Sequence, residues 1–180
     1  MIIFAISEIG MAGAQSAIDM LRPLAETSAR RLAIAEQVAL AKWDSRAAVE
    51  DAPREAQVIV AAVKYGKSRG LDGTFVSSCF IAQIEANKLI QYSLLADWRR
   101  TGRAPAHRPI DLAAVRRELD RLQIELIEEL ADTAPVRARA TCQADTAKAV
   151  GKYLIAHGHL DRSLQGIALD RALATICTAE

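Results

Sequence analysis

Residues 14–43 read AQSAIDMLRPLAETSARRLAIAEQVALAKW, and the spacing of their apolar side chains decides the fold class. Those side chains recur at intervals of three and four residues, so they share one face of a helix with 3.6 residues per turn. They are Ile18, Leu21, Ala25, Leu32, Ala35, Val38 and Ala39. We therefore predict one long amphipathic helix. Because Pro23 lies inside the stretch, we also expect a kink or a later helix start there.

The rest of the chain shows the same helical spacing, while β-branched clusters and hairpin dipeptides are scarce. We predict a second helix with Pro53 in its first turn and its end at Gly70, and a third helix over about 72–98. Residues 100–109 form a linker, a fourth helix follows over 112–130, and two shorter helices end the chain. The prediction is an all-α, single-domain bundle of about six helices over residues 14–180, behind a lead-in of residues 1–13.

Composition excludes some kinds of partner. Of the 180 residues, 51% are hydrophobic and 25% are charged, and the formal net charge is +1. This balance gives no electrostatic reason to expect nucleic acid or an anionic membrane surface. No apolar run reaches the roughly 18 residues that span a bilayer. Residues 1–13 lack the basic region and uninterrupted apolar core of a secretory signal. We expect a protein that binds neither nucleic acid nor membrane.

Polar side chains recur on the faces that the helices turn toward one another. Arg31 and Lys42 are eleven residues apart, which is about three helical turns, so they project from the same side of the first helix. The later helices carry further candidates at one-turn spacing or beside an apolar stripe: Asp51, Arg54 and Glu55; Asn87 and Gln91; and Arg116. Taken singly, each long side chain is also compatible with reaching out to water. Buried together, the cations need anions, which a small dianionic ligand supplies.

Four stretches together resemble a known family. They are RRLAIAEQVALAKW (30–43), VEDAPREAQV (49–58), FIAQIEANKLIQYSLLADW (80–98) and DLAAVRRELDRL (111–122). They resemble the all-α chorismate mutases, and most closely the secreted subclass in which a single chain forms the whole site. The resemblance is good from about Leu21 to Arg116 and extends more loosely to Cys177. It implies a helical bundle that binds chorismate and rearranges it to prephenate, in aromatic amino-acid biosynthesis, with no metal and no cofactor.

The resemblance also implies a role for each cation and for the amides. Arg31 and Arg116 clamp the two substrate carboxylates. Lys42 binds a carboxylate and, together with Gln91, donates to the ether oxygen of the substrate. Asn87 lies near a carboxylate, at a position where the family often has a small hydroxyl residue.

The remaining implied roles belong to the turn that precedes the second helix. Asp51 and Glu55 engage the ring hydroxyl of the substrate, and Arg54 supports the pocket. Val58 departs from the family pattern, because some secreted members have a polar residue there.

The cysteines extend the same resemblance. Cys142 and Cys177 occupy positions that resemble a disulfide of the secreted subclass, whereas Cys79 lies on an apolar helix and is expected to stay free. The bridge implies an exported, periplasmic protein. Without the bridge, we would expect a cytoplasmic protein. We expect a homodimer with each site inside one chain. His157 and His159 lack a third ligand at useful spacing, so we predict no metal site.

Two other functions remain open at this level. One is an isochorismate-pyruvate lyase, which a related helical scaffold also supports. The other is a helical interaction protein that keeps the scaffold without catalysis. Turnover of chorismate compared with isochorismate distinguishes the first, and the absence of chorismate binding by a folded protein identifies the second.

Overall fold

The computed structural model describes residues 16–158 and 163–178, so the predictions for residues 1–13 and for His159 lie outside it. The described part of the chain contains helices and no strand, which confirms the all-α prediction. There are eight helices in it: α1 Ala17–Ala33, α2 Ala35–Ser45, α3 Ala52–Ser68, α4 Gly73–Thr101, α5 Leu112–Asp132, α6 Ala134–Arg137, α7 Cys142–Ala156 and α8 Leu164–Leu173.

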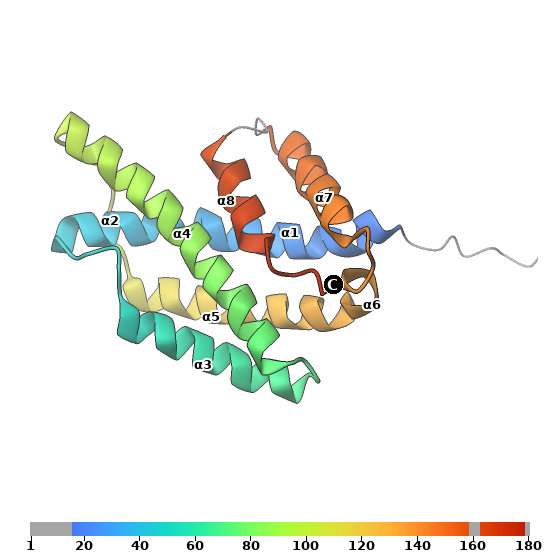
Figure 1. Cartoon of the computed structure of the whole chain (residues 1–180). Coiled ribbons are helices and arrows are strands. Elements are labelled where there is room, and N and C mark those ends of the chain that lie inside the picture. Colours follow the sequence, from blue (N-terminus) through green and yellow to red (C-terminus); the bar gives the residue numbers. More distant parts are fainter. Residues whose placement is uncertain (1–15, 159–162, 179–180) are drawn as a thin grey trace, which may run out of the picture.

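The first predicted helix is divided in two. The break falls at Ile34, between α1 and α2, and not at Pro23. Ile34 keeps right-handed dihedral angles (φ −71°, ψ −19°), so α2 continues nearly in line with α1 (Figure 1). Of the two alternatives for Pro23, the later helix start is excluded, because α1 begins at Ala17, where the Ser16 hydroxyl accepts a hydrogen bond from the Asp19 amide at 3.1 Å.

The other helix boundaries follow from local chemistry. Asp51, Asp72 and Asp111 each cap a helix by accepting hydrogen bonds from backbone amides of its first turn. Gly102 adopts φ +72° at the end of α4, a left-handed conformation that costs other residues more. One further helical turn, α6, follows α5 directly, and the sequence pattern did not predict it.

Helix α1 is the centre of the packing. It contacts α5, α7 and α8 along its length, while the long α4 crosses the bundle and packs against α2, α3 and α8 (Figure 1). Large apolar side chains that are fully buried at these contacts form the core, among them Leu21, Leu24, Phe80, Leu126 and Leu130. As a result α2, α3, α4 and α5 meet at one end of the bundle, and α6, α7 and α8 gather at the other.

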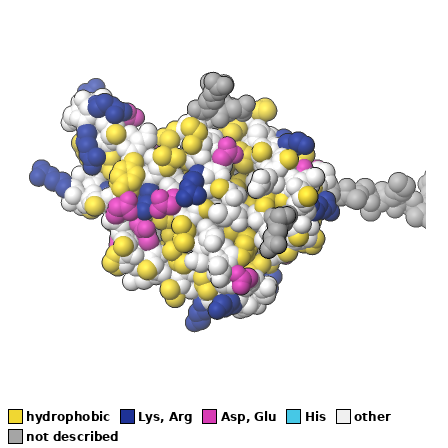
Figure 2. Space-filling view, viewed as in Figure 1, with side chains coloured by type: hydrophobic (Ala, Val, Ile, Leu, Met, Phe, Trp, Pro, Cys, Tyr) yellow, Lys and Arg dark blue, Asp and Glu magenta, His cyan; other side chains and the backbone are white. Residues whose placement is uncertain are grey.

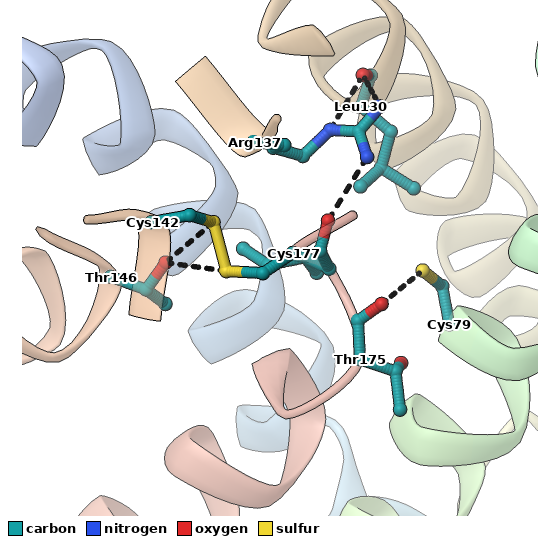
Figure 3. The surroundings of a disulfide bond; sticks show 8 residues. Cys79, Leu130, Arg137, Cys142, Thr146, Thr175 and Cys177 are labelled. Carbon is teal, nitrogen blue, oxygen red and sulfur yellow. Dashed lines mark hydrogen bonds between the residues drawn. A yellow bond between two sulfur atoms is a disulfide. The ribbon is translucent and has the colours of Figure 1, made fainter. Parts of the chain in front are cut away.

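The α6–α8 end carries the disulfide. Cys142 at the start of α7 is bonded to Cys177 after α8, which confirms the predicted pairing (Figure 3). Cys79 is a buried free thiol, also as predicted, and burial raises its pKa to about 11. Beside the bridge, Arg137 donates to the carbonyl oxygens of Leu130 and Ile176, which ties the C-terminal segment to the end of α5.

Within residues 16–158 and 163–178, no helix combines the length and the apolar character that crossing a membrane requires.

Candidate active site

A cavity of about 260 Å³ lies where α2, α3, α4 and α5 meet, with the end of α1 at its base. The structure brings all eight predicted site residues to its lining: Arg31, Lys42, Asp51, Arg54, Glu55, Asn87, Gln91 and Arg116. These side chains come from five helices and the turn before α3, and all of them border the same cavity.

Arg31 is the most deeply placed cation, with 7% of its surface exposed. Its Nε donates to Gln83 Oε1 at 3.2 Å and its Nη1 donates to the Leu119 carbonyl oxygen at 3.1 Å. Burial lowers the pKa of Arg31 to about 10, so the guanidinium is still charged at neutral pH. In the described part of the chain no carboxylate lies within 4.0 Å of it, and Nη2 has no hydrogen-bond partner. A charge this deep is available to an anion in the cavity.

Lys42 projects from α2 and also lines the cavity. Its ammonium donates to the carbonyl oxygen of Val49, which holds the turn 46–50 against the end of α2. Burial lowers the pKa of Lys42, although Asp51 and Glu55 oppose this effect. Among the described residues, Lys42 has no carboxylate within ion-pair distance either.

The start of α3 forms the acidic wall. Asp51 accepts a hydrogen bond from the Arg54 amide at 3.2 Å, and Glu55 Oε1 accepts one from the Asp51 amide at 3.1 Å. The two carboxylates thus cap the helix reciprocally, and both face the cavity. The Arg54 guanidinium pairs with Asp120 of α5 at 3.3 Å, so it links two walls.

A row of side-chain amides on α4 lines another part of the cavity. Asn87 Nδ2 donates to the Arg31 carbonyl oxygen at 3.0 Å, and Gln91 Nε2 donates to Asn87 Oδ1 at 2.7 Å. Gln91 Oε1 is buried without a hydrogen-bond partner, and one of the two Nε2 hydrogens of Gln91 is left over by this arrangement. The row therefore keeps unused hydrogen-bonding capacity next to the cavity.

Arg116 lines the cavity from the second turn of α5 and is exposed at the rim. No ion pair with Arg116 is found in the described residues, whereas its neighbour Arg117 lies 3.9 Å from Asp111. Three cations from three helices, Arg31, Lys42 and Arg116, thus border one cavity without a carboxylate partner among those residues.

Known proteins are similar to this chain in sequence and in architecture. A secreted chorismate mutase of Mycolicibacterium smegmatis is 30% identical over 138 residues, which cover 77% of this chain and 76% of that protein. This chain belongs to the chorismate mutase family. The family description "Chorismate mutase type II" matches residues 22–92.

Two other members extend the likeness. A secreted chorismate mutase of Mycobacterium tuberculosis is 29% identical over 159 residues, covering 88% of this chain and 79% of that protein. The crystal structure of chorismate mutase from Burkholderia phymatum superimposes with a TM-score of 0.85 at 44% identity, covering 91% of this chain and 99% of that one. The chorismate mutase fold therefore extends well beyond the stretch in which the sequence resemblance is strongest.

Several polar lining residues of this chorismate mutase family member were not predicted from the sequence, among them Gln83, Lys88 and Gln123. Helical spacing could have indicated two of them. Gln83 lies one turn before Asn87, and Gln123 lies two turns after Arg116 on the same helix face. Lys88 had no such indication, because its burial results from carboxylates that other segments supply.

Proposed function

We propose that this protein rearranges chorismate to prephenate in the cavity between α2, α3, α4 and α5. The observation that carries the proposal is the trio of cations, Arg31, Lys42 and Arg116, which border the cavity unpaired within the described residues. Chorismate brings two carboxylates, so binding it supplies the missing negative charge. Family membership supports the same activity.

The reaction depends mainly on how the protein holds the substrate. A Claisen rearrangement breaks one carbon–oxygen bond and forms one carbon–carbon bond inside a single molecule, with no nucleophile and no proton transfer. Holding the substrate in its compact conformer therefore removes much of the barrier. Arg31 and Arg116 clamp the two carboxylates in this proposal, and Asn87 lies near one of them. Bidentate contacts between guanidinium and carboxylate fix the orientation as well as the position.

The remaining barrier falls through hydrogen-bond donors aimed at the ether oxygen, where negative charge develops as the bond breaks. Lys42 and Gln91 fill this role, Lys42 with its ammonium and Gln91 with the Nε2 hydrogen that Asn87 does not use. On the acidic wall, Asp51 and Glu55 accept from the ring hydroxyl. Arg54 supports the wall through Asp120.

We also propose an exported, periplasmic location and a homodimer whose sites each lie within one chain. The Cys142–Cys177 disulfide supports export, because such bonds persist in oxidising compartments, and the relatives from both mycobacteria are described as secreted. The lining of the cavity by one chain supports a site complete without a partner. Light scattering of the purified protein tests the dimer, and fractionation of expressing cells tests the location.

The activity is tested with the purified protein and its two possible substrates. We expect chorismate to disappear with formation of an equal amount of prephenate. Release of pyruvate from isochorismate, with chorismate left intact, would establish the lyase instead. A folded protein that binds neither compound would leave the interaction protein as the remaining hypothesis, and Lys42→Ala serves as the control with reduced activity.

A further inference from the structure

Lys88 lies at the centre of an acidic cluster that borders the cavity. It projects from the middle of α4, and only 11% of its side chain is exposed. Its Nζ lies 2.6 Å from Glu50 Oε2, 2.8 Å from Glu85 Oε1 and 3.4 Å from Glu55 Oε2. Figure 2 shows acidic side chains gathered around a basic one over the middle of α4, beside the segment that leads into α3. One ammonium therefore joins three carboxylates, two from the segment 50–55 and one from α4 itself.

The cluster fixes the wall of the proposed site. Glu55 Oε1 accepts from the Asp51 amide while Glu55 Oε2 faces Lys88, so both oxygens of this carboxylate are held. Glu50 is held in the same way, because its second oxygen accepts from the Tyr92 hydroxyl at 2.6 Å. Helix α4 thus grips the segment 50–55 through two of its side chains, Lys88 and Tyr92.

Lys88 also balances charge. Glu50, Asp51, Glu55 and Glu85 are close together beside a cavity that we propose takes a dianion. Burial acts to lower the pKa of Lys88, but hydrogen bonds to Glu50 and Glu85 outweigh it and the pKa lies above its usual value. The ammonium is therefore charged throughout the working pH range, and it offsets part of the acidic charge.

We propose that Lys88 is a positioning residue of the active site, which holds the Glu55 carboxylate in place and neutralises the acidic wall around the substrate. An exposed ion pair would contribute little. Lys88 differs, because its own side chain is almost fully buried and the Glu55 carboxylate that it contacts is only 25% exposed, whereas Glu50 and Glu85 are 56% and 41% exposed. The catalytic part of this inference rests on the proposed mutase activity, whereas the grip on Glu55 does not.

A double-mutant cycle tests the coupling between Lys88 and Glu55. Lys88→Met keeps the length of the side chain and removes its charge, and we expect kcat/KM to fall by about tenfold or more, as for loss of a hydrogen bond between charged groups. In a Glu55→Gln background the same change should cost less than about threefold, because contacting residues are not additive. Lys88→Arg should recover most of the activity.

Glu85→Gln is the matched control. It removes the Lys88 partner that lies on the same helix and leaves both contacts to the wall, so we expect kcat/KM within about twofold of the parent. Equal losses from Lys88→Met in both backgrounds, or a negligible loss in the parent, would overturn the proposal.

The four proteins of the cycle, which are the parent, Lys88→Met, Glu55→Gln and the double variant, also separate this proposal from the proposed activity. Their free energies of unfolding in urea give a second cycle that needs no substrate, and a coupling between Lys88 and Glu55 is expected there too. If the parent does not consume chorismate, the proposed activity fails while this cycle still decides whether Lys88 holds Glu55. Absence of coupling in the unfolding cycle would refute the grip itself.

Discussion

Two buried arginines, one at each end of the bundle, differ in how completely they are bonded. Arg137, 2% exposed, donates from all three of its nitrogens to the carbonyl oxygens of Leu130 and Ile176, at 2.8–3.1 Å, and its guanidinium lies 4.3 Å from the centre of the Phe75 ring. Arg31, 7% exposed, donates from two nitrogens and has no partner for the third within the described residues. Every nitrogen of Arg137 thus has a hydrogen-bond partner, whereas one nitrogen of Arg31 has none.

The difference separates a structural role from a binding role. A buried polar group whose nitrogens are all bonded within the protein stabilises the fold and is less available to a ligand. At the cavity end, Arg31, Gln91 and the exposed Arg116 keep capacity unused, whereas the α6–α8 end is closed by Arg137 and a covalent bond. Changes at the two ends should therefore have separable effects, and four predictions test this.

The largest expected effect is on stability and comes from the disulfide. Cys142 and Cys177 are 35 residues apart, and a cross-link over a loop of this length stabilises by about 2–4 kcal/mol. We expect Cys142→Ser/Cys177→Ser to lose that much free energy of unfolding in urea, with kcat unchanged at 25 °C while the protein is folded. In Cys79→Ala, which keeps the bridge, a reductant should still lower stability. A large loss of kcat in the folded double variant would show that the two ends are not separable.

Arg31→Ala should remove about 2–3 kcal/mol of transition-state stabilisation, measured as kcat/KM, because a fixed charge aimed at the substrate is lost. Lys42→Ala should do the same. Arg137→Met is the matched variant: it leaves carbonyl oxygens of Leu130 and Ile176 unpaired and should cost about 1–3 kcal/mol of stability while the folded protein turns over normally. Near-parental turnover by Arg31→Ala would place this arginine with Arg137, as a structural residue.

Gln91→Glu sharpens the comparison through pH. Gln91 is neutral, so we expect the kcat of the parent to vary little between about pH 5 and pH 8. A carboxyl at this position, where Gln91 is 4% exposed, has its pKa raised by burial and can donate only while protonated. The variant should be active at acidic pH and lose activity as pH rises through that pKa. A flat profile with similar activity at high pH would show that Gln91 does not face the ether oxygen.

The smallest expected effect concerns Glu129, a carboxylate with one unbonded oxygen that does not line the cavity. Its Oε1 accepts from the Thr27 hydroxyl at 2.7 Å, and its buried Oε2 has no partner. Burial raises the pKa of Glu129 to about 7, so the folded state holds this proton more tightly than the unfolded state. The resulting stability is fully present below about pH 4.5 and is lost as pH rises through about 7.

Glu129→Gln should remove this pH dependence. We expect the Tm of the variant to match the parent near pH 5 and to exceed it near pH 8, by a few degrees at most, in parallel thermal melts. An equal difference at both pH values would mean that Glu129 does not titrate on unfolding in this range. A confirmed result would show that unused bonding capacity marks a ligand site only where a cavity adjoins it.

Helical periodicity predicted most of the fold, because the three- and four-residue spacing of apolar side chains continues across small local irregularities of the backbone. The break at Ile34 could not be predicted, since the dihedral angles there remain right-handed and the apolar spacing continues across it. The single turn of α6 is too short for any period. The disulfide followed from the family resemblance alone, because three cysteines allow three pairings.

The site was predicted where its residues share one helix face with others of the same kind. Arg31 with Lys42, and Asn87 with Gln91, met that condition. Lys88 did not, because what buries it comes from Glu50 and Glu55, which are 38 and 33 residues away. Contacts between segments that are distant in sequence have no local pattern to reveal them.

The reciprocal cap at the start of α3 affects how related sequences are to be interpreted. The Asp51 carboxylate accepts from the Arg54 amide and the Glu55 carboxylate accepts from the Asp51 amide, so both stabilise the start of the helix whether or not a substrate is ever bound. Selection for folding alone would therefore retain this pair in a descendant that had lost its catalytic activity. Arg31 and Lys42 also bond within the fold, but they cap no helix, so their replacement in a relative is a better sign of a change in activity than retention of Asp51 and Glu55 is of its preservation.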